Sequence, residues 1–179
     1  MSKVIKMSLS TRSIQQAIRE IQRYKAEMHT KLQIMCNELA DLGLETISAV
    51  IAEIPADEQG LKDGGLTVEP IYSRDDVPIG AAIHLRGSQV AFLEFSAGAR
   101  YGTDSYPLES GAPYGMGTYP GKGHWNDPKG WWYYDPTSSE ANERGYVHTY
   151  GNRAYMPMYR AWEAIVLAVA NVAKDVFGD

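Results

Sequence analysis

The chain has 179 residues, of which 44% are hydrophobic, and it carries a formal net charge of −5. This balance leaves no basic surface to neutralise phosphates or anionic lipid, so we expect no direct contact with nucleic acid and none with a membrane. The single cysteine, Cys36, cannot form a disulfide within the chain, and its apolar neighbours indicate a packing role rather than a nucleophile.

An apolar seam with helical spacing runs through the amino-terminal part of the chain. The positions of this seam lie alternately four and three residues apart, and Lys25 occupies one of them. The apolar members are Ile14, Ile18, Ile21, Met28, Leu32, Met35, Leu39 and Leu42. The seam fits either one long helix or two helices that meet between residues 24 and 30, and because Lys25 interrupts the stripe we favour a break or bend there. Ser10 or Ser13 is the expected amino-terminal cap. Gly43 is expected to close this run. A further helix should then end near Ile54, before Pro55.

Three short runs with β-type composition follow, at residues 66–72, 81–85 and 89–95. Turn-rich sequence separates them, which predicts a small antiparallel meander. Residues 86–88 are short enough for a hairpin between the second and third strands.

Residues 96–130 break every periodic pattern, because they hold eight glycines and four prolines. Loops of this length are functional or lack order of their own, so we predict a long arm within the domain that orders against a partner. The candidate assembly contacts in and next to this arm are Arg100, Tyr101, Trp125, Trp131 and Trp132.

The aromatic run at residues 131–134 predicts a strand, and residues 145–151 are expected to pair with it and finish the sheet. One of Trp131 and Trp132 should lie in the core and the other outside. Apolar residues at helical spacing predict a terminal helix over residues 158–176, with Pro157 near its first turn. Together these elements predict one α+β domain over residues 1–179, in which a small antiparallel sheet packs against the carboxy-terminal helix and the amino-terminal helices.

The residues that carry chemistry are sparse. His124, Asp127 and His148 would make a two-histidine, one-carboxylate metal set, but such residues are common in glycine-rich loops without a metal. Glu94, paired with Asp104 or Glu109 near the aromatic residues, would suit a cell-wall glycan hydrolase or a sugar-binding module. No glycine loop for phosphate or dinucleotide binding is present in the sequence. We therefore predict no catalytic set, no metal site and no cofactor.

Several short stretches, taken in their order, resemble a family of minor tail components of long-tailed bacteriophages. In that family a strand ending in Glu-Phe-Gly leads through a variable glycine-rich loop to a Gly-Trp strand and a terminal helix. The corresponding stretches here are 13–18 with Ile21, Tyr24 and Lys25, then Val90 to Phe95 with Ser96 in the glycine position, Gly130 to Tyr134, His148 to Gly151, and Ala154 to Tyr159.

This resemblance implies a structural virion protein of the phage neck or tail-completion region, without enzymatic activity, that helps heads and tails to join. It implies a ring of identical subunits, with a sixfold ring as the expected form, in contact with neighbouring neck or tail proteins. The protein would be found in the virion and, during assembly, in the host cytoplasm. A neck ring and a tail-terminating ring are both open at this point, and a glycan hydrolase or sugar-binding module that uses Glu94 is the alternative function.

Overall fold

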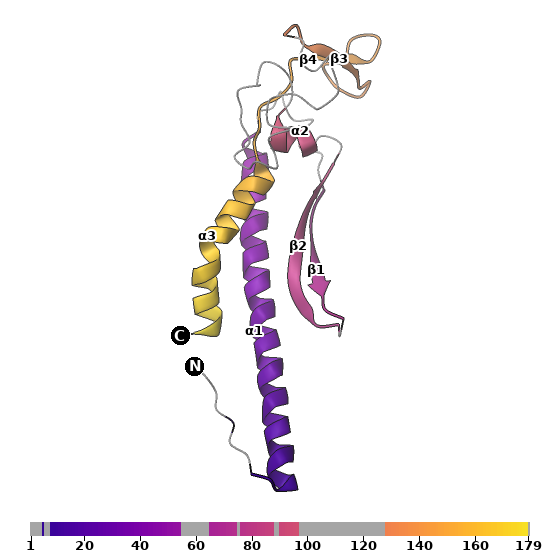
Figure 1. Cartoon of the computed structure of the whole chain (residues 1–179). Coiled ribbons are helices and arrows are strands. Elements are labelled where there is room, and N and C mark those ends of the chain that lie inside the picture. Colours follow the sequence, from indigo (N-terminus) through magenta and orange to yellow (C-terminus); the bar gives the residue numbers. More distant parts are fainter. Residues whose placement is uncertain are drawn as a thin grey trace. The chain divides into compact units, whose positions relative to one another are not determined.

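The structure is a computed structural model that describes residue 5 and residues 8–54, 65–74, 76–87, 90–96 and 128–178. Its elements in chain order are α1 (Thr11–Ala52), β1 (Gly65–Tyr72), β2 (Pro78–Arg86), α2 (Val90–Phe95), β3 (Trp131–Tyr134), β4 (Tyr146–Thr149) and α3 (Pro157–Phe177), as Figure 1 shows. Helices and small antiparallel sheets make the fold α+β, which confirms the predicted class. The predicted arm at residues 96–130 lies almost wholly outside the described residues.

The chain divides into two compact units. Unit 1 comprises residues 1–45, 67–84 and 162–179, and unit 2 comprises residues 46–66 and 85–161. The expectation of one domain from end to end stays a prediction.

A single helix, α1, replaces the two or three helices predicted for residues 10–54, so the predicted break near Lys25 was wrong. Lys25 is exposed, and lysine is a good helix former, so it interrupts the apolar stripe without disturbing the backbone. Ser10 caps the helix, because its Oγ accepts a hydrogen bond from the Ser13 N–H at 3.3 Å. The helix ends at Ala52, close to the predicted end at Ile54.

Gly43 lies inside α1 and does not end it, which corrects the predicted helix stop. A Cβ at this position would collide with Cδ1 of Ile83 on β2, and it would lie 3.0 Å from Cδ1 of Ile165 on α3. Glycine therefore serves here to let a strand and a second helix approach the α1 backbone, at the centre of unit 1.

β1 and β2 pair in a two-stranded sheet, as predicted, but the expected third strand is the short helix α2. The run Val90–Phe95 has a β-type composition in sequence, whereas in the structure it is helical and the adjacent residues Leu93 and Glu94 are both buried. The Ser96 N–H donates to the Phe92 carbonyl at 2.9 Å, which closes the helical turn. Because α2 stands where the third strand was expected, the predicted hairpin between a second and a third strand was wrong.

The core of unit 2 gathers around α2. Leu93 packs in a cluster with Val50, Ile54 and Tyr155, and Ile51 and Leu85 border this cluster. The Leu93 carbonyl also accepts a hydrogen bond from the Tyr155 N–H at 2.9 Å. Burying side chains of this size contributes about 1.5–3 kcal/mol each. These apolar contacts therefore stabilise α2, which is too short to be a stable helix without them.

β3 and β4 form a second antiparallel sheet, with Trp131 opposite Thr149 and Tyr134 opposite Tyr146. Both strands were predicted, but they make a separate sheet and do not finish the first one. The terminal helix α3 begins at Pro157, as expected, because proline lacks the N–H that the first turn cannot bond. Among the described residues, no helix combines the length and apolar character needed to cross a membrane.

Candidate interaction surfaces

The β3–β4 sheet carries a row of rings on one face. Successive side chains of a strand point to opposite faces, so the pairing of Trp132 with His148 and of Tyr134 with Tyr146 puts these four rings together. Tyr150 follows β4 and joins them through His148. These five residues are called the aromatic face below. Trp132 is 57% exposed and Tyr134 is 65% exposed, so large ring surfaces reach solvent.

The rings of the aromatic face contact one another edge to face or at a tilt. The centroids of Trp132 and His148 lie 4.8 Å apart, and those of His148 and Tyr150 lie 4.9 Å apart at 87°. Tyr134 and Tyr146 meet at 5.3 Å and 65°. Nε2 of His148 lies 2.9 Å from the Lys129 carbonyl, which makes that nitrogen the donor and fixes the ring. The rings are therefore held in place before any partner arrives.

Two glycines shape the ends of this sheet. Gly130 has a φ of 76°, and a Cβ there would collide with the Thr149 carbonyl and lie 3.1 Å from the His148 ring. Gly145, with a φ of 78°, precedes β4 in the turn. Asn142 holds this turn, because its Oδ1 accepts from the Arg144 N–H at 2.9 Å and from the Tyr146 N–H at 3.1 Å.

Asp135 organises the other side of the turn. Its Oδ1 accepts from the Thr137 hydroxyl at 2.7 Å and from the Thr137 N–H at 3.1 Å. These hydrogen bonds, the hydroxyl one first, lower the pKa of the Asp135 carboxyl below its ordinary value. Burial, with the charges of Asp135 and Glu140, raises the pKa of Tyr133. Tyr133 therefore remains a neutral hydroxyl beside these carboxylates.

The opposite face of the sheet belongs to the interior of unit 2. Trp131 and Val147 are both buried there. The two adjacent tryptophans therefore differ as the sequence predicted, with Trp131 in the core and Trp132 outside.

Glu94 is a buried carboxylate with a clear structural task. Its Oε2 accepts from the Met158 N–H and its Oε1 from the Tyr159 N–H, each at 2.9 Å. The N–H groups of the first turn of a helix have no carbonyl partner within the helix, and the helix dipole favours a negative charge there. Asn152 ties the same region to α2, since its Nδ2 donates to the Phe92 carbonyl at 2.7 Å.

Unit 1 exposes two apolar stripes. The first, on α1, consists of Ile14, Ile18 and Ile21, which are between 38% and 54% exposed. The second, on α3, consists of Trp162, Val166 and Val169, which are between 40% and 51% exposed. These sets are called the α1 stripe and the α3 stripe below. Contiguous apolar surface of this kind marks interaction sites in soluble proteins.

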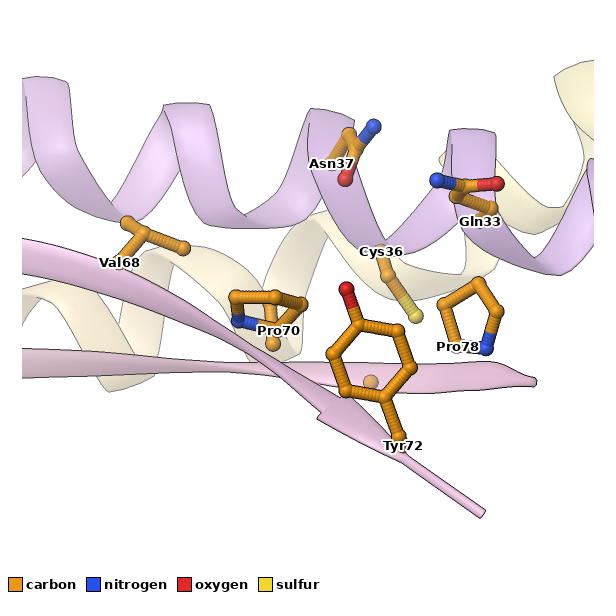
Figure 2. A pocket seen from close by; sticks show the side chains of 9 residues that line it. Gln33, Cys36, Asn37, Val68, Pro70, Tyr72 and Pro78 are labelled. Atoms are coloured by element: carbon orange, nitrogen blue, oxygen red, sulfur yellow. The ribbon is translucent and has the colours of Figure 1, made fainter. Parts of the chain in front are cut away.

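Unit 1 also holds a shallow pocket of about 220 Å³ between α1 and the β1–β2 sheet. Figure 2 shows Cys36 pointing from α1 toward Tyr72 and Pro78, with Gln33 and Asn37 beside it. The thiol is half-buried and its surroundings are mostly apolar, in keeping with the packing role predicted for it. Within the described part of the chain, no group of three or more histidine, cysteine, aspartate or glutamate side chains is placed to hold a metal ion.

The structure describes two of the five predicted contact residues, Trp131 and Trp132. Arg100, Tyr101 and Trp125 lie outside the described residues, as do His124 and Asp127 of the hypothetical metal set. Trp132 lies at the centre of the aromatic face, and Trp131 lies under it. Tyr134, Tyr146 and Tyr150 were not predicted as contact residues, although the alternation of β3 against β4 would have placed them beside Trp132.

A scan against known protein families, a search of curated proteins and a search of solved structures found no match to this chain.

Proposed function

We propose that this protein is a structural virion protein of a long-tailed bacteriophage, which assembles as a ring in the neck or tail-completion region and takes part in head–tail joining. The observation that carries the proposal is the exposed apolar surface of unit 1 together with the aromatic face of unit 2. Such surfaces suit a part that becomes buried in a larger assembly. The proposal includes no catalytic residue and no cofactor.

The backbone at Ser96 supports the resemblance to the phage family. Ser96 stands where that family usually has glycine, and its φ is 67°, a left-handed conformation that glycine adopts at little cost. The Gly-Trp strand and the terminal helix follow in the expected order as β3 and α3. The Glu-Phe segment differs, because it ends a helix here and not a strand.

The two stripes support self-association. Burial of an exposed apolar stripe against another subunit would stabilise the assembly by about 25 cal/mol for each Å² of apolar surface removed from water. In a ring the same contact repeats between each pair of neighbours. The aromatic face is then left for a different neighbour in the particle, since Tyr and Trp combine large apolar area with a polar group.

The geometry of Glu94 bears on the alternative of a glycan hydrolase. A general acid or nucleophile has to reach the glycosidic bond, whereas both oxygens of Glu94 accept hydrogen bonds from the start of α3. No contact among the described residues favours this alternative.

Light scattering of the purified protein over a concentration series tests the self-association. We expect a ring-sized mass that is reached as concentration rises, and electron microscopy of the same samples should show closed rings. A mass that stays monomeric up to millimolar concentration would overturn the proposal of a self-assembling ring.

In vitro complementation tests the place in the particle. Phage particles made without this protein should accumulate as separate filled heads and tails, and adding the purified protein should join them. Restored joining by a protein whose aromatic face is intact, and not by Trp132→Ala, would connect the surface to the function. Joining that proceeds without the protein would argue against the neck assignment.

A further inference from the structure

The α1 and α3 stripes share one spacing. The α1 stripe continues from Ile14, Ile18 and Ile21 to Lys25 and the half-buried Met28, at steps of four, three, four and three. The α3 stripe repeats the same steps from Trp162, Val166 and Val169 to the half-buried Ala173 and Val176. Steps that average 3.5 residues are the spacing at which two helices interlock side chains along a shared seam.

The two stripes also match in length. Residues 14–28 and residues 162–176 each cover about 21 Å of helix at 1.5 Å per residue. Each is exposed in the single chain, although the same α1 face is covered farther along, where Gly43 contacts Ile83 and Ile165. Ile14, Ile18 and Ile21 stay at least 38% exposed on this face although Ala17 between them is buried, and an α3 helix from a second copy would cover these isoleucines.

Charge gives the pairing a direction. Lys25 is the one charged residue in the α1 stripe, and it is exposed. On α3 no charged residue lies between Glu163 and Lys174, and the exposed Glu163 is next to Trp162 at one end of the stripe. An antiparallel arrangement sets Ile21 level with Val169 and Lys25 level with Val166, one turn from Glu163. A parallel arrangement would set Lys25 beside Ala173 and Lys174 instead.

We propose that the α1 stripe of one copy packs antiparallel on the α3 stripe of a second copy, with Lys25 paired to Glu163. The second copy is the occupant because one chain carries both surfaces and they match in spacing, length and charge. The contact joins two different surfaces, so it is head to tail, and repeated contacts give a closed ring when the rotation between neighbours divides a full turn. This inference rests on the proposed ring assembly and names the surfaces that build it.

Charge reversal tests the pairing in the full chain. Lys25→Glu and Glu163→Lys should each weaken association about tenfold, because each sets like charges against each other at the seam. The double variant should restore association to about the value of the unchanged protein. Arg23→Glu is the matched control, since it makes the same change at an exposed position on the opposite side of α1, and it should leave the dissociation constant unchanged.

A crosslinking experiment tests the register independently of the charges. In a Cys36→Ala background, one protein carries Ile21→Cys and another carries Val169→Cys. Oxidation of the mixture should give the disulfide-linked pair of unlike proteins, and circular dichroism should confirm that both are folded. Crosslinks that form only between like proteins would overturn the head-to-tail arrangement.

The outcomes separate this inference from the ring proposal. If Lys25→Glu weakens the oligomer no more than Arg23→Glu does, the α1–α3 contact is overturned and the ring proposal stands. The same holds if the double variant fails to restore association. A protein that stays monomeric at every concentration would overturn both.

Discussion

Glu94 and Met158 are 64 positions apart in the sequence, yet Oε2 of Glu94 accepts a hydrogen bond from the Met158 N–H at 2.9 Å. The other oxygen accepts from the Tyr159 N–H. The short helix α2 thus supplies the cap for the start of α3, and both contacts lie within unit 2. The stability of this unit should depend strongly on one carboxylate.

We expect Glu94→Gln to lower the free energy of unfolding by about 1–2 kcal/mol, because the amide has one acceptor oxygen where two N–H groups need one each. Glu94→Ala should cost more, since it leaves both N–H groups without this acceptor. Urea unfolding followed by tryptophan fluorescence measures the change. The control is Glu53→Gln, which removes only an exposed ion pair with Arg160 at 3.5 Å and should change stability by about 0.5 kcal/mol or less. If Glu94→Gln and Glu53→Gln lower the free energy of unfolding equally, the capping hydrogen bonds of Glu94 contribute no more than an exposed ion pair.

Ser96→Gly should stabilise the protein. The serine has a φ of 67°, and its buried Oγ has no hydrogen-bond partner among the described residues. Relief of the left-handed strain contributes about 1–2 kcal/mol and loss of the buried hydroxyl about 1–3, against about 0.5–1 for the added freedom of glycine in the unfolded chain. Thermal unfolding of Ser96→Gly and Ser96→Ala separates the two contributions, because alanine removes only the hydroxyl. A glycine variant less stable than the serine protein would contradict the prediction.

The pKa of Asp135 should depend on the Thr137 hydroxyl. Thr137→Val removes the 2.7 Å hydrogen bond that is the largest cause of the lowered pKa, so the pKa of Asp135 should rise toward its ordinary value. A carboxyl with a lowered pKa in the folded state stabilises the fold above its unfolded pKa, and this contribution is lost as pH falls through the folded pKa. The variant turn should therefore loosen at a higher pH than the unchanged turn. NMR titration of the Asp135 carboxyl carbon measures the shift, and an unchanged titration curve would count against this hydrogen bond.

The two neighbouring tryptophans should respond in opposite ways. Trp131→Ala should cost about 3–5 kcal/mol of stability, because Trp131 is buried. Trp132→Ala removes an exposed ring with one tilted contact to His148, so it should cost about 0.5–1.5 kcal/mol and mainly weaken binding to the neighbouring protein. Urea unfolding and the head–tail joining assay together make this comparison. A Trp132→Ala protein that joins heads and tails normally would remove the aromatic face from the proposed function.

The strongly periodic parts of the sequence predicted the fold well. The seam from Ile14 to Leu42 indicated a helix, and the terminal run indicated α3 to within about one residue at each end. The error at Lys25 arose from treating a break in the apolar stripe as a break in the backbone, which a lysine does not cause.

The segment Val90–Phe95 shows where local pattern fails. Its valine and its two phenylalanines suit a strand, but Leu93 packs on Tyr155, and Glu94 accepts hydrogen bonds from Met158 and Tyr159. These partners are about sixty positions away, so no local pattern contains them. The role of Glu94 as a helix cap could not be predicted from the sequence for the same reason.

Cys36 gives unit 1 a built-in reporter of its own motion. The chain has one cysteine, and that thiol lies half-buried between α1 and the β1–β2 sheet. A thiol reagent added to the native protein should react faster when the sheet separates from the helix, so the labelling rate measures how often that local opening occurs. The opening frequency of this one layer can thus be followed without introducing any substitution.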